Sequence, residues 1–411
     1  MISSILAGSL LICGCAPAET PTPTPTPEVP QEEVQINILP VYALTGYYAA
    51  FARDIVAGFT AGIEHYNAVG YIPGVEVVAD VIDHASDPAK ASAAFKMGIG
   101  RTPKPVLAIT TFSAGAMAAK ELLKREQVSL LTPSSNPMLH GPGDINFSDG
   151  SRFTGEIAAF ADYFVENLWS EARPPRYAMV TWDTAFGHFV VMDTLIDYIK
   201  AAGVEYMGEV YIPANCTDAT IQLSQLKQWD VDFVNGATIY PDTARVIRDA
   251  HKLGLWDDIV WSQGHWQAVG ALTKDLGPMI NGLYWVHGYA MLDDFEPWMK
   301  DAFAESGVTK EQYTYFGAGM LDAKLAFEAI KIAAEKVGPE NVTGTDVYDA
   351  FRTIDDFCFS SVACRTPLDF TQDSVGAQYM DIYQMQNEQP VRVEEAIYCP
   401  NIWPGGKDVV Q

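Results

Sequence analysis

Histidine and cysteine, which supply most metal ligands and many catalytic groups, are thinly spread along this chain of 411 residues. The histidines are His65, His84, His140, His188, His251, His265 and His287, and none lies at metal-ligand spacing from another histidine or a cysteine. The sequence has no CxxC, HExxH or acidic calcium loop, and no GxSxG, Walker or GxGxxG motif follows a strand-like run. His84 stands near Asp83 and Asp87 and could act as a base, but a surface turn has the same composition. We therefore expect no catalysis, no metal and no cofactor.

The first residues contain the features of an export signal. Residues 1–15 carry no charge, and their apolar stretch from Ile5 to Ile12 fits the core of such a signal but is too short to span a bilayer. The ICGC run at 12–15 resembles a bacterial lipobox, in which the last cysteine receives lipid. We expect lipidation at Cys15, which would anchor the chain to the cell membrane. The alternative is an ordinary secretory signal cut near Ala18.

Residues 16–35 form the next segment, with PTPTPTP at 21–27. Proline at every second position excludes helix and sheet pairing and favours an extended spacer, which at this length reaches up to ~60 Å. We expect a linker that holds a folded body away from a membrane, and hence an extracytoplasmic location.

Charge and hydropathy exclude two classes of partner for the body. Lysine and arginine number 26 against 52 aspartate and glutamate, a formal charge of −26. So acidic a surface repels phosphate, which argues against nucleic-acid binding. No run of 18 or more apolar residues follows residue 15, so we expect that only the lipid anchor contacts the membrane.

Strand-like and helix-like segments alternate along the body. Strands are predicted at 34–39, 75–82, 106–111 and 128–132, with helices at 54–69, 88–100 and 114–127. The pattern then restarts, with strands at 177–182, 205–212, 233–237, 259–262 and 282–286 and helices at 154–171, 189–202, 219–229 and 242–253. Helices at 296–306, 315–337 and 347–353 precede a tail of strand and loop. Two such series predict two α/β lobes with parallel sheets, and a ligand site in the cleft between them.

The body contains four cysteines whose state depends on the compartment. Cys358 and Cys364 lie six positions apart, and in an exported protein they could close a small disulfide loop. Cys216 and Cys399 are left over. The alternative interpretation, that all four cysteines are buried and unpaired thiols, is equally well supported.

Five stretches carry motifs of a known family in a fixed order. They are residues 43–91, with LTG, YNAVG and DP, then AITTFSAGAMAAK at 108–120, LLTPSSNPML at 130–139, VTWDTAFG at 180–187 and GATIYPDTARVIRDAHKLGL at 236–255. The set resembles the type I periplasmic-binding fold, in its leucine/isoleucine/valine-binding branch of ABC-transporter solute-binding proteins.

The resemblance implies two doubly wound lobes joined by a hinge of three crossovers, near residues 150, 289 and 370. The N-terminal lobe would comprise 36–150 and 290–370, and the C-terminal lobe 151–289 and 371–411. Such a protein is a monomer and not an enzyme, and it closes over a small molecule and delivers it to ABC permease subunits. A sensory ectodomain of the same fold is the alternative, followed by a secreted α/β enzyme.

The resemblance also assigns candidate ligand-binding residues. In the family, hydroxyls and helix-start N–H groups hold an amino-acid carboxylate, a role that falls here on Ser113, Ala114, Ser134, Ser135 and Asn136. Serine is equally an ordinary helix cap. The aromatic residues expected to face the cleft are Phe51, Phe186, Tyr240 and Trp266, while others such as Tyr48 and Trp182 are expected to be packing.

The ammonium-binding half of the family's site departs from the pattern. The segment WSQGHWQA at 261–268 has His265 where the family has an acid, and the GSRFTGE segment at 150–156 offers basic Arg152 before Glu156. A buried ammonium without a carboxylate would be costly. The family's usual ligand is a branched-chain amino acid, but with Arg152 or His265 near the cleft a related carboxylate or amide would fit better.

Overall fold

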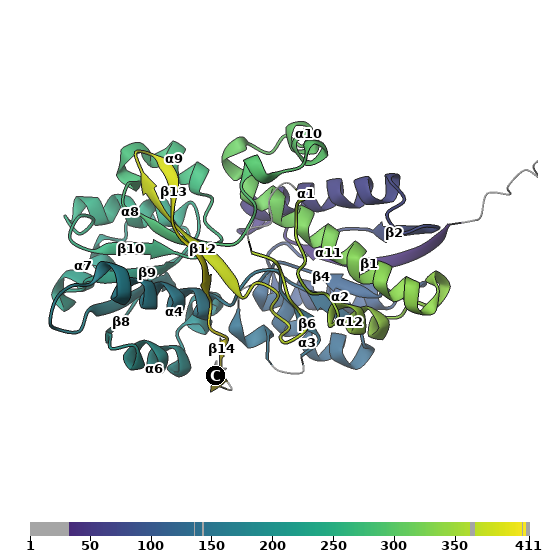
Figure 1. Cartoon of the computed structure of the whole chain (residues 1–411), viewed down its shortest axis with the longest axis horizontal. Helices are drawn as coiled ribbons and strands as arrows, with labels where there is room; N and C mark the ends of the chain where they lie inside the picture. The colour runs from purple at the N-terminus through teal and green to yellow at the C-terminus, as the bar shows by residue number, and fades with distance from the viewer. Residues whose placement is uncertain (1–32, 135, 142–143, 362–365, 405, 408–411) are drawn as a thin grey trace, which may run out of the picture. The chain divides into compact units, whose positions relative to one another are not determined.

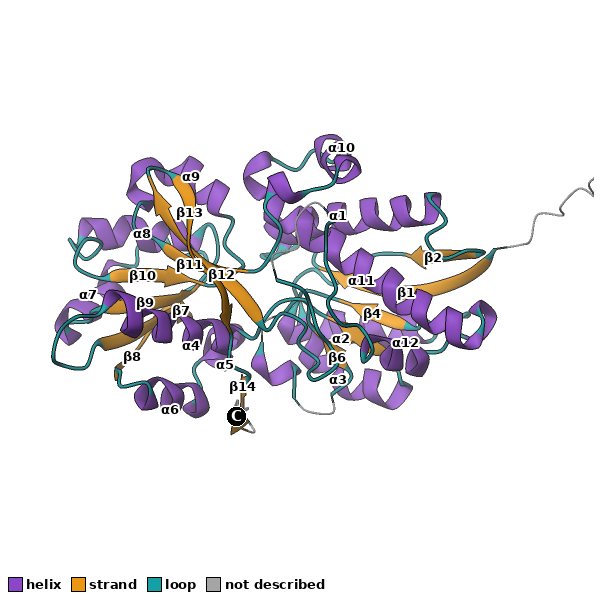
Figure 2. Cartoon of the chain, in the orientation of Figure 1, coloured by secondary structure: helices purple, strands orange, loops and turns teal. Residues whose placement is uncertain are grey.

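The computed structural model describes residues 33–134, 136–141, 144–361, 366–404 and 406–407. Cys15, the signal peptide and nearly all of the expected linker lie outside the described residues, as do Ser135 and Cys364. The described chain forms two β-sheets with helices around each (Figures 1 and 2). We call them the sheets of the N-terminal and C-terminal lobes.

The N-terminal sheet is parallel throughout. Its strands run in the order β2-β1-β4-β5-β6, and β3 pairs with the end of β1. The bounds are β1 Val34–Tyr42, β2 Val75–Ala79, β3 Ile82–Asp83, β4 Leu107–Ile109, β5 Ser129–Leu131 and β6 Asn146–Phe147. Every residue of β4 and β5 is buried, because helices cover both faces of the sheet.

The C-terminal sheet is mixed, in the order β13-β12-β11-β10-β9-β7-β8. Its parallel strands are β7 Arg176–Trp182, β8 Glu205–Ile212, β9 Phe233–Ala237, β10 Val260–Gln263 and β11 Tyr284–His287. The antiparallel strands β12 Tyr379–Gln386 and β13 Gln389–Tyr398 come from the end of the chain and extend this sheet (yellow in Figure 1). A short pair, β14 Ile402–Trp403 and β15 Gly406–Lys407, follows.

The helices of the N-terminal lobe come from both halves of the sequence. They are α1 Ala49–Ala68, α2 Pro88–Ile99, α3 Ser113–Glu126, α10 Pro297–Glu305, α11 Tyr313–Val337 and α12 Gly344–Phe351, with 3-10 turns η1 Pro137–Leu139, η4 Leu292–Asp294, η5 Lys310–Gln312 and η6 Pro339–Asn341. Local sequence sets their ends: Asp87 accepts hydrogen bonds from Ala89 N (2.8 Å) and Lys90 N (3.2 Å), and Pro88 occupies the first turn of α2.

The helices of the C-terminal lobe follow the strand order. They are α4 Phe153–Tyr163, α6 Asp193–Ala201, α7 Thr220–Trp229, α8 Asp242–Lys252 and α9 Val269–Leu276, with the π-helical turn η2 Phe164–Leu168, the 3-10 turn η3 Gly277–Ile280 and the short α5 Ala185–Val190. The prediction of a single helix at 189–202 is wrong. The chain breaks between α5 and α6 because Val191 and Met192 take extended backbone angles.

The chain passes between the sheets three times: after β6, after β11 and before β12. No helix of the described residues combines the length and apolar character that a bilayer-spanning segment needs.

Candidate functional site

A cavity of about 50 Å³ is lined by residues of both lobes. The N-terminal lobe contributes Tyr48, Phe51, Thr111, Ser113 and Ser134, and the C-terminal lobe contributes Trp182, Phe186, Ile239 and Trp266. Most of these residues lie just beyond the carboxyl ends of β4, β5, β7, β9 and β10. This is the edge at which parallel α/β sheets bind ligands.

Two buried hydroxyls form the polar part of the cavity wall. Ser113 is the first residue of α3, whose N-cap makes no side-chain hydrogen bond, and Ser134 follows β5. Their Oγ atoms are hydrogen bonded to each other, and Thr132 Oγ1 accepts a bond from Ser134 N at 3.3 Å. The start of α3 therefore places the Ser113 hydroxyl in the cavity wall, and a helix N-terminus is suited to a carboxylate.

Aromatic rings make up most of the remaining wall. On the N-terminal side, Phe51 lies 4.9 Å from Tyr48 and 5.6 Å from Tyr315, measured between ring centroids. On the C-terminal side, Trp182 Nε1 donates to Asp242 at 2.8 Å, and Phe186 packs edge-on against Phe153 at 5.6 Å. These contacts hold the rings in fixed orientations, so the cavity has a defined apolar shape.

Contacts between the lobes lie next to the cavity. Tyr315, in the first turn of α11, donates from its hydroxyl to the backbone oxygen of Trp266 at 3.1 Å. Lys274 of α9 pairs with Glu311 of η5 at 3.5 Å, and a Cβ added at Gly270 would lie 2.9 Å from the Glu311 backbone. The lobes therefore touch on the α9 side of the cavity.

The structure brings together Phe51, Ser113, Ser134, Phe186 and Trp266 from the sequence-based set. Tyr240 lines an adjoining hollow of about 40 Å³ with Tyr47, Asn215 and Asp242, and this hollow shares Tyr48, Phe51, Trp182 and Ile239 with the first. Its position next to the cavity follows from these shared walls.

Three other candidates do not line the cavity. Ala114 lies in the first turn of α3, outside the lining. Asn136 is fully buried and caps η1, accepting a hydrogen bond from Met138 N at 2.9 Å. His265 is fully buried and is not among the residues that line the cavity.

Sequence reasoning assigned Tyr48 and Trp182 to packing, yet both line the cavity. Their positions next to the end of a strand or the start of a helix could have identified both as cavity residues. Trp182 is the last residue of β7, and Tyr48 directly precedes α1. Thr111 and Ile239 also line the cavity, and the sequence analysis did not single them out.

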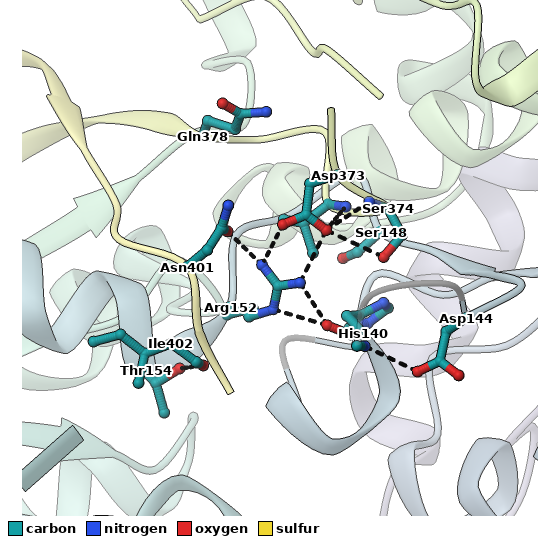
Figure 3. Close-up of polar contacts among 12 residues, drawn as sticks. His140, Asp144, Ser148, Arg152, Thr154, Asp373, Ser374, Gln378, Asn401 and Ile402 are labelled. Atoms are coloured by element: carbon teal, nitrogen blue, oxygen red, sulfur yellow. Dashed lines mark hydrogen bonds and ion pairs between the residues drawn. The ribbon is translucent and has the colours of Figure 1, made fainter. Parts of the chain in front are cut away.

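Arg152, the cation expected near the cleft, forms its hydrogen bonds away from the cavity (Figure 3). Its guanidinium forms a bidentate pair with Asp373, at 2.9 and 3.0 Å, and also donates to the His140 backbone oxygen and to Asn401. The side chain is 1% exposed. Burial alone would raise the pKa of Asp373, but the hydrogen bonds and charge of Arg152 lower it. Arg152 thus joins the first and third passages between the sheets instead of facing the cavity.

His265 forms a buried pair with Glu156 of α4. Glu156 accepts hydrogen bonds from His265 N at 3.0 Å, from the His265 ring at Nδ1 and from Ser151 Oγ at 2.7 Å. Both oxygens of Glu156 are therefore used inside the C-terminal lobe. The acid that could have replaced the family's ammonium partner is not exposed in the cavity.

A second buried acidic group lies where the chain first passes between the sheets. Asp149 and Asp322 of α11 are both fully or almost fully buried, and Tyr42 donates to Asp322 at 3.2 Å. Burial raises the pKa of Asp149 to about 7. Burial, and then repulsion from Asp149, raise the pKa of Asp322 well above its usual value.

Cysteine states are partly defined by the structure. Cys358 is disulfide-bonded, while its expected partner Cys364 lies outside the described residues. Cys216 and the buried Cys399 are free thiols. Among the described residues, no cluster of three or more His, Cys, Asp or Glu side chains is arranged to hold a metal ion.

Two α/β lobes, connected three times and enclosing a small cavity at the carboxyl ends of their strands, define a binding protein of the periplasmic type. A profile of the periplasmic binding protein family matches residues 35–390, and the chain belongs to this family.

Relatives and solved structures agree with this assignment. The Leu/Ile/Val/Thr-binding protein of Salmonella typhimurium is 24% identical over 230 residues, which is 56% of this chain. The chain spans 62% of that relative's length. A Thermus thermophilus branched-chain amino acid ABC transporter structure with bound valine has a TM-score of 0.78 at 18% identity, covering 89% of this chain and 97% of the other. A fatty acid ABC transporter substrate-binding protein from Thermomonospora curvata has a TM-score of 0.72 at 17% identity, covering 90% and 93%.

Proposed function

We propose that this protein is an extracytoplasmic solute-binding protein of an ABC importer that captures a small amino acid or a related carboxylate or amide. The observation that carries the proposal is the cavity with walls from both lobes. A solute held there contacts both lobes only when they are together. That differential affinity would shift the population toward the closed form.

The hinge in this proposal consists of the three passages between the sheets, at residues 148–152, at residues 288–291 and in the segment that leads into β12. Arg152 and Asp373 connect two of them through a buried ion pair. Such a pair would hold the passages together while the lobes rotate.

Ser113 and Ser134 would hold the carboxylate of the solute at the start of α3. Phe51, Phe186 and Trp266 would cover its apolar part, with Tyr48 and Trp182 added from the structure. The names of relatives support a small apolar solute, since one binds leucine, isoleucine, valine and threonine and one structure holds valine.

The location and partner belong to the same proposal. Lipid attached at Cys15 would anchor the protein, residues 16–35 would act as its spacer, and the closed form would dock on ABC permease subunits as a monomer. A disulfide between Cys358 and Cys364 would close a small loop.

Mass spectrometry of small molecules released when the purified protein is denatured would identify the solute, and calorimetry would then measure its affinity. We expect Ser113→Ala to weaken binding about 10- to 100-fold, since it removes a hydrogen bond to a charged group. Ser224→Ala on α7, away from the cavity, should bind like the wild type. Wild-type affinity in the Ser113 variant would contradict the site, and turnover of the solute would contradict a binding function.

A further inference from the structure

We propose that the solute is an aromatic carboxylate that carries no ammonium group. This inference rests on the proposed function and narrows its ligand class. It departs from the amino acids named for the relatives, and three features of the cavity carry it.

The first feature concerns the charged groups that could pair with an ammonium in the cavity. Among the described residues that line the cavity, none is Asp, Glu, Lys, Arg or His. In the adjoining hollow the carboxylate is Asp242, which already accepts bonds from Trp182 Nε1 at 2.8 Å, Asn215 N at 2.9 Å and Cys216 N at 3.1 Å. Glu156 already accepts hydrogen bonds from His265 and Ser151.

The energetic consequence concerns the amino group of an amino acid. An ammonium brought into this cavity would lose its water and find hydroxyls and ring faces, but no carboxylate. Cation–π attraction from Trp182 or Trp266 offsets only part of that desolvation penalty. A carboxylate meets a better environment at the start of α3, beside Ser113 and Ser134. The cavity therefore favours a ligand with one negative charge and no positive charge.

The second feature is the composition of the walls, since five of the nine lining residues are aromatic. Tyr48 and Phe51 come from one lobe, and Trp182, Phe186 and Trp266 from the other. Aromatic walls of this kind can stack on a flat ring, and aromatic pairs gain interaction energy beyond their buried area.

The third feature is that the rings are held in place by their surroundings. Asp242 fixes the indole of Trp182, and the Tyr315 hydroxyl binds the backbone of Trp266. Phe51 packs on Tyr315, and Phe186 on Phe153. A slot whose walls are already ordered loses less side-chain entropy when a rigid ring enters it.

The experiment compares ligands that differ only in the ammonium group. Calorimetry on the wild-type protein would use 3-phenylpropanoate against phenylalanine, and 4-methylpentanoate against leucine. We expect 3-phenylpropanoate to bind at least about tenfold tighter than phenylalanine, and tighter than 4-methylpentanoate.

Two variants test the physical reasons separately. Ile239→Asp adds a carboxylate to the C-terminal wall, and Ile239→Asn is its isosteric control. Relative to the control, the aspartate should shift selectivity toward phenylalanine by at least about tenfold. Phe186→Leu should weaken 3-phenylpropanoate more than 4-methylpentanoate. Phe359→Leu, at a ring that packs on Phe295 and does not line the cavity, should change neither.

The outcomes separate this inference from the proposed function. Tighter binding of leucine or phenylalanine than of the matched acids would overturn the ligand class and keep the binding function. Tighter binding of trimethylglycine than of 3-phenylpropanoate would also overturn it, because the rings would then hold a quaternary ammonium. If no probe binds and denaturation releases no small molecule, both proposals fail.

Discussion

At the residue scale, Arg152 and Glu156 lie near the lobe junction, where both are buried and bonded to other side chains. Arg152 pairs with Asp373, and Glu156 pairs with His265. Burial, together with the nearby charge of Arg152, lowers the pKa of His140 to about 4, so this imidazole is neutral at physiological pH. These residues therefore contribute to the junction between the lobes. Hydroxyl and aromatic side chains make up most of the cavity wall.

Asp149 gives a prediction about pH. Its folded pKa of about 7 lies above the ordinary value of 3.8, so the folded state binds its proton more tightly than the unfolded state does. The resulting stabilisation is complete below about pH 4 and is lost as the pH rises to about 7. Asp322, Tyr42, Tyr289, His265 and Glu156 are the titratable groups that surround or interact with Asp149 through this cluster.

We expect Asp149→Asn, which mimics the neutral acid, to remove this pH dependence and to raise the free energy of unfolding at pH 8 by up to about 4 kcal/mol. Urea denaturation between pH 4 and pH 8 would measure it, with the exposed Asp257→Asn as control. Parallel profiles for the wild type and the Asp149 variant would contradict the buried, protonated carboxyl.

At the element scale, the N-terminal lobe depends on the contact of α1 with α11, two helices about 250 residues apart in sequence order. Glycines allow their backbones to approach. A Cβ at Gly319 would lie 1.9 Å from Ile55 O, and one at Gly58 would lie 1.9 Å from Phe316 O. Since α11 carries Tyr315 and α1 carries Phe51, this contact also positions one wall of the cavity.

Gly319→Ala should force the two helices apart and lower the free energy of unfolding by about 1–3 kcal/mol. Gly100→Ala is the matched control, because a Cβ there meets nothing closer than 3.5 Å and the backbone φ is −76°. Thermal and chemical denaturation would measure both variants, and equal stabilities would argue against a tight α1–α11 contact.

At the scale of the whole described body, the lobes meet through the three chain passages and through side-chain contacts beside the cavity. In the Lys274–Glu311 pair the lysine side chain is 68% exposed, so the pair contributes little to stability. The hydrogen bond from Tyr315 to the Trp266 backbone is better protected, since Tyr315 is 2% exposed. It forms only when the lobes are together.

Tyr315→Phe should therefore weaken ligand binding about two- to tenfold, because it removes one hydrogen bond of the closed form and keeps the ring. Calorimetry would measure affinity, and small-angle X-ray scattering the closure on ligand addition. Tyr206→Phe is the control, since that hydroxyl binds Glu209 within β8. Equal affinity in both variants would show that the Tyr315 bond does not support closure.

Local strand and helix periodicity predicts the two α/β lobes, whereas the family resemblance supplied Phe51, Ser113, Ser134, Phe186 and Trp266 as candidate site residues. The structure places these five residues in the wall of one cavity, at the edge where the carboxyl ends of parallel strands meet.

Which charged side chains are kept out of the cavity wall depends on tertiary packing. Arg152 binds Asp373, 221 positions away, Glu156 binds His265, 109 positions away, and Tyr42 binds Asp322, 280 positions away. Such pairs depend on how distant elements pack and have no local pattern in sequence. The lack of an exposed counter-charge, on which the ligand class depends, follows from these long-range contacts.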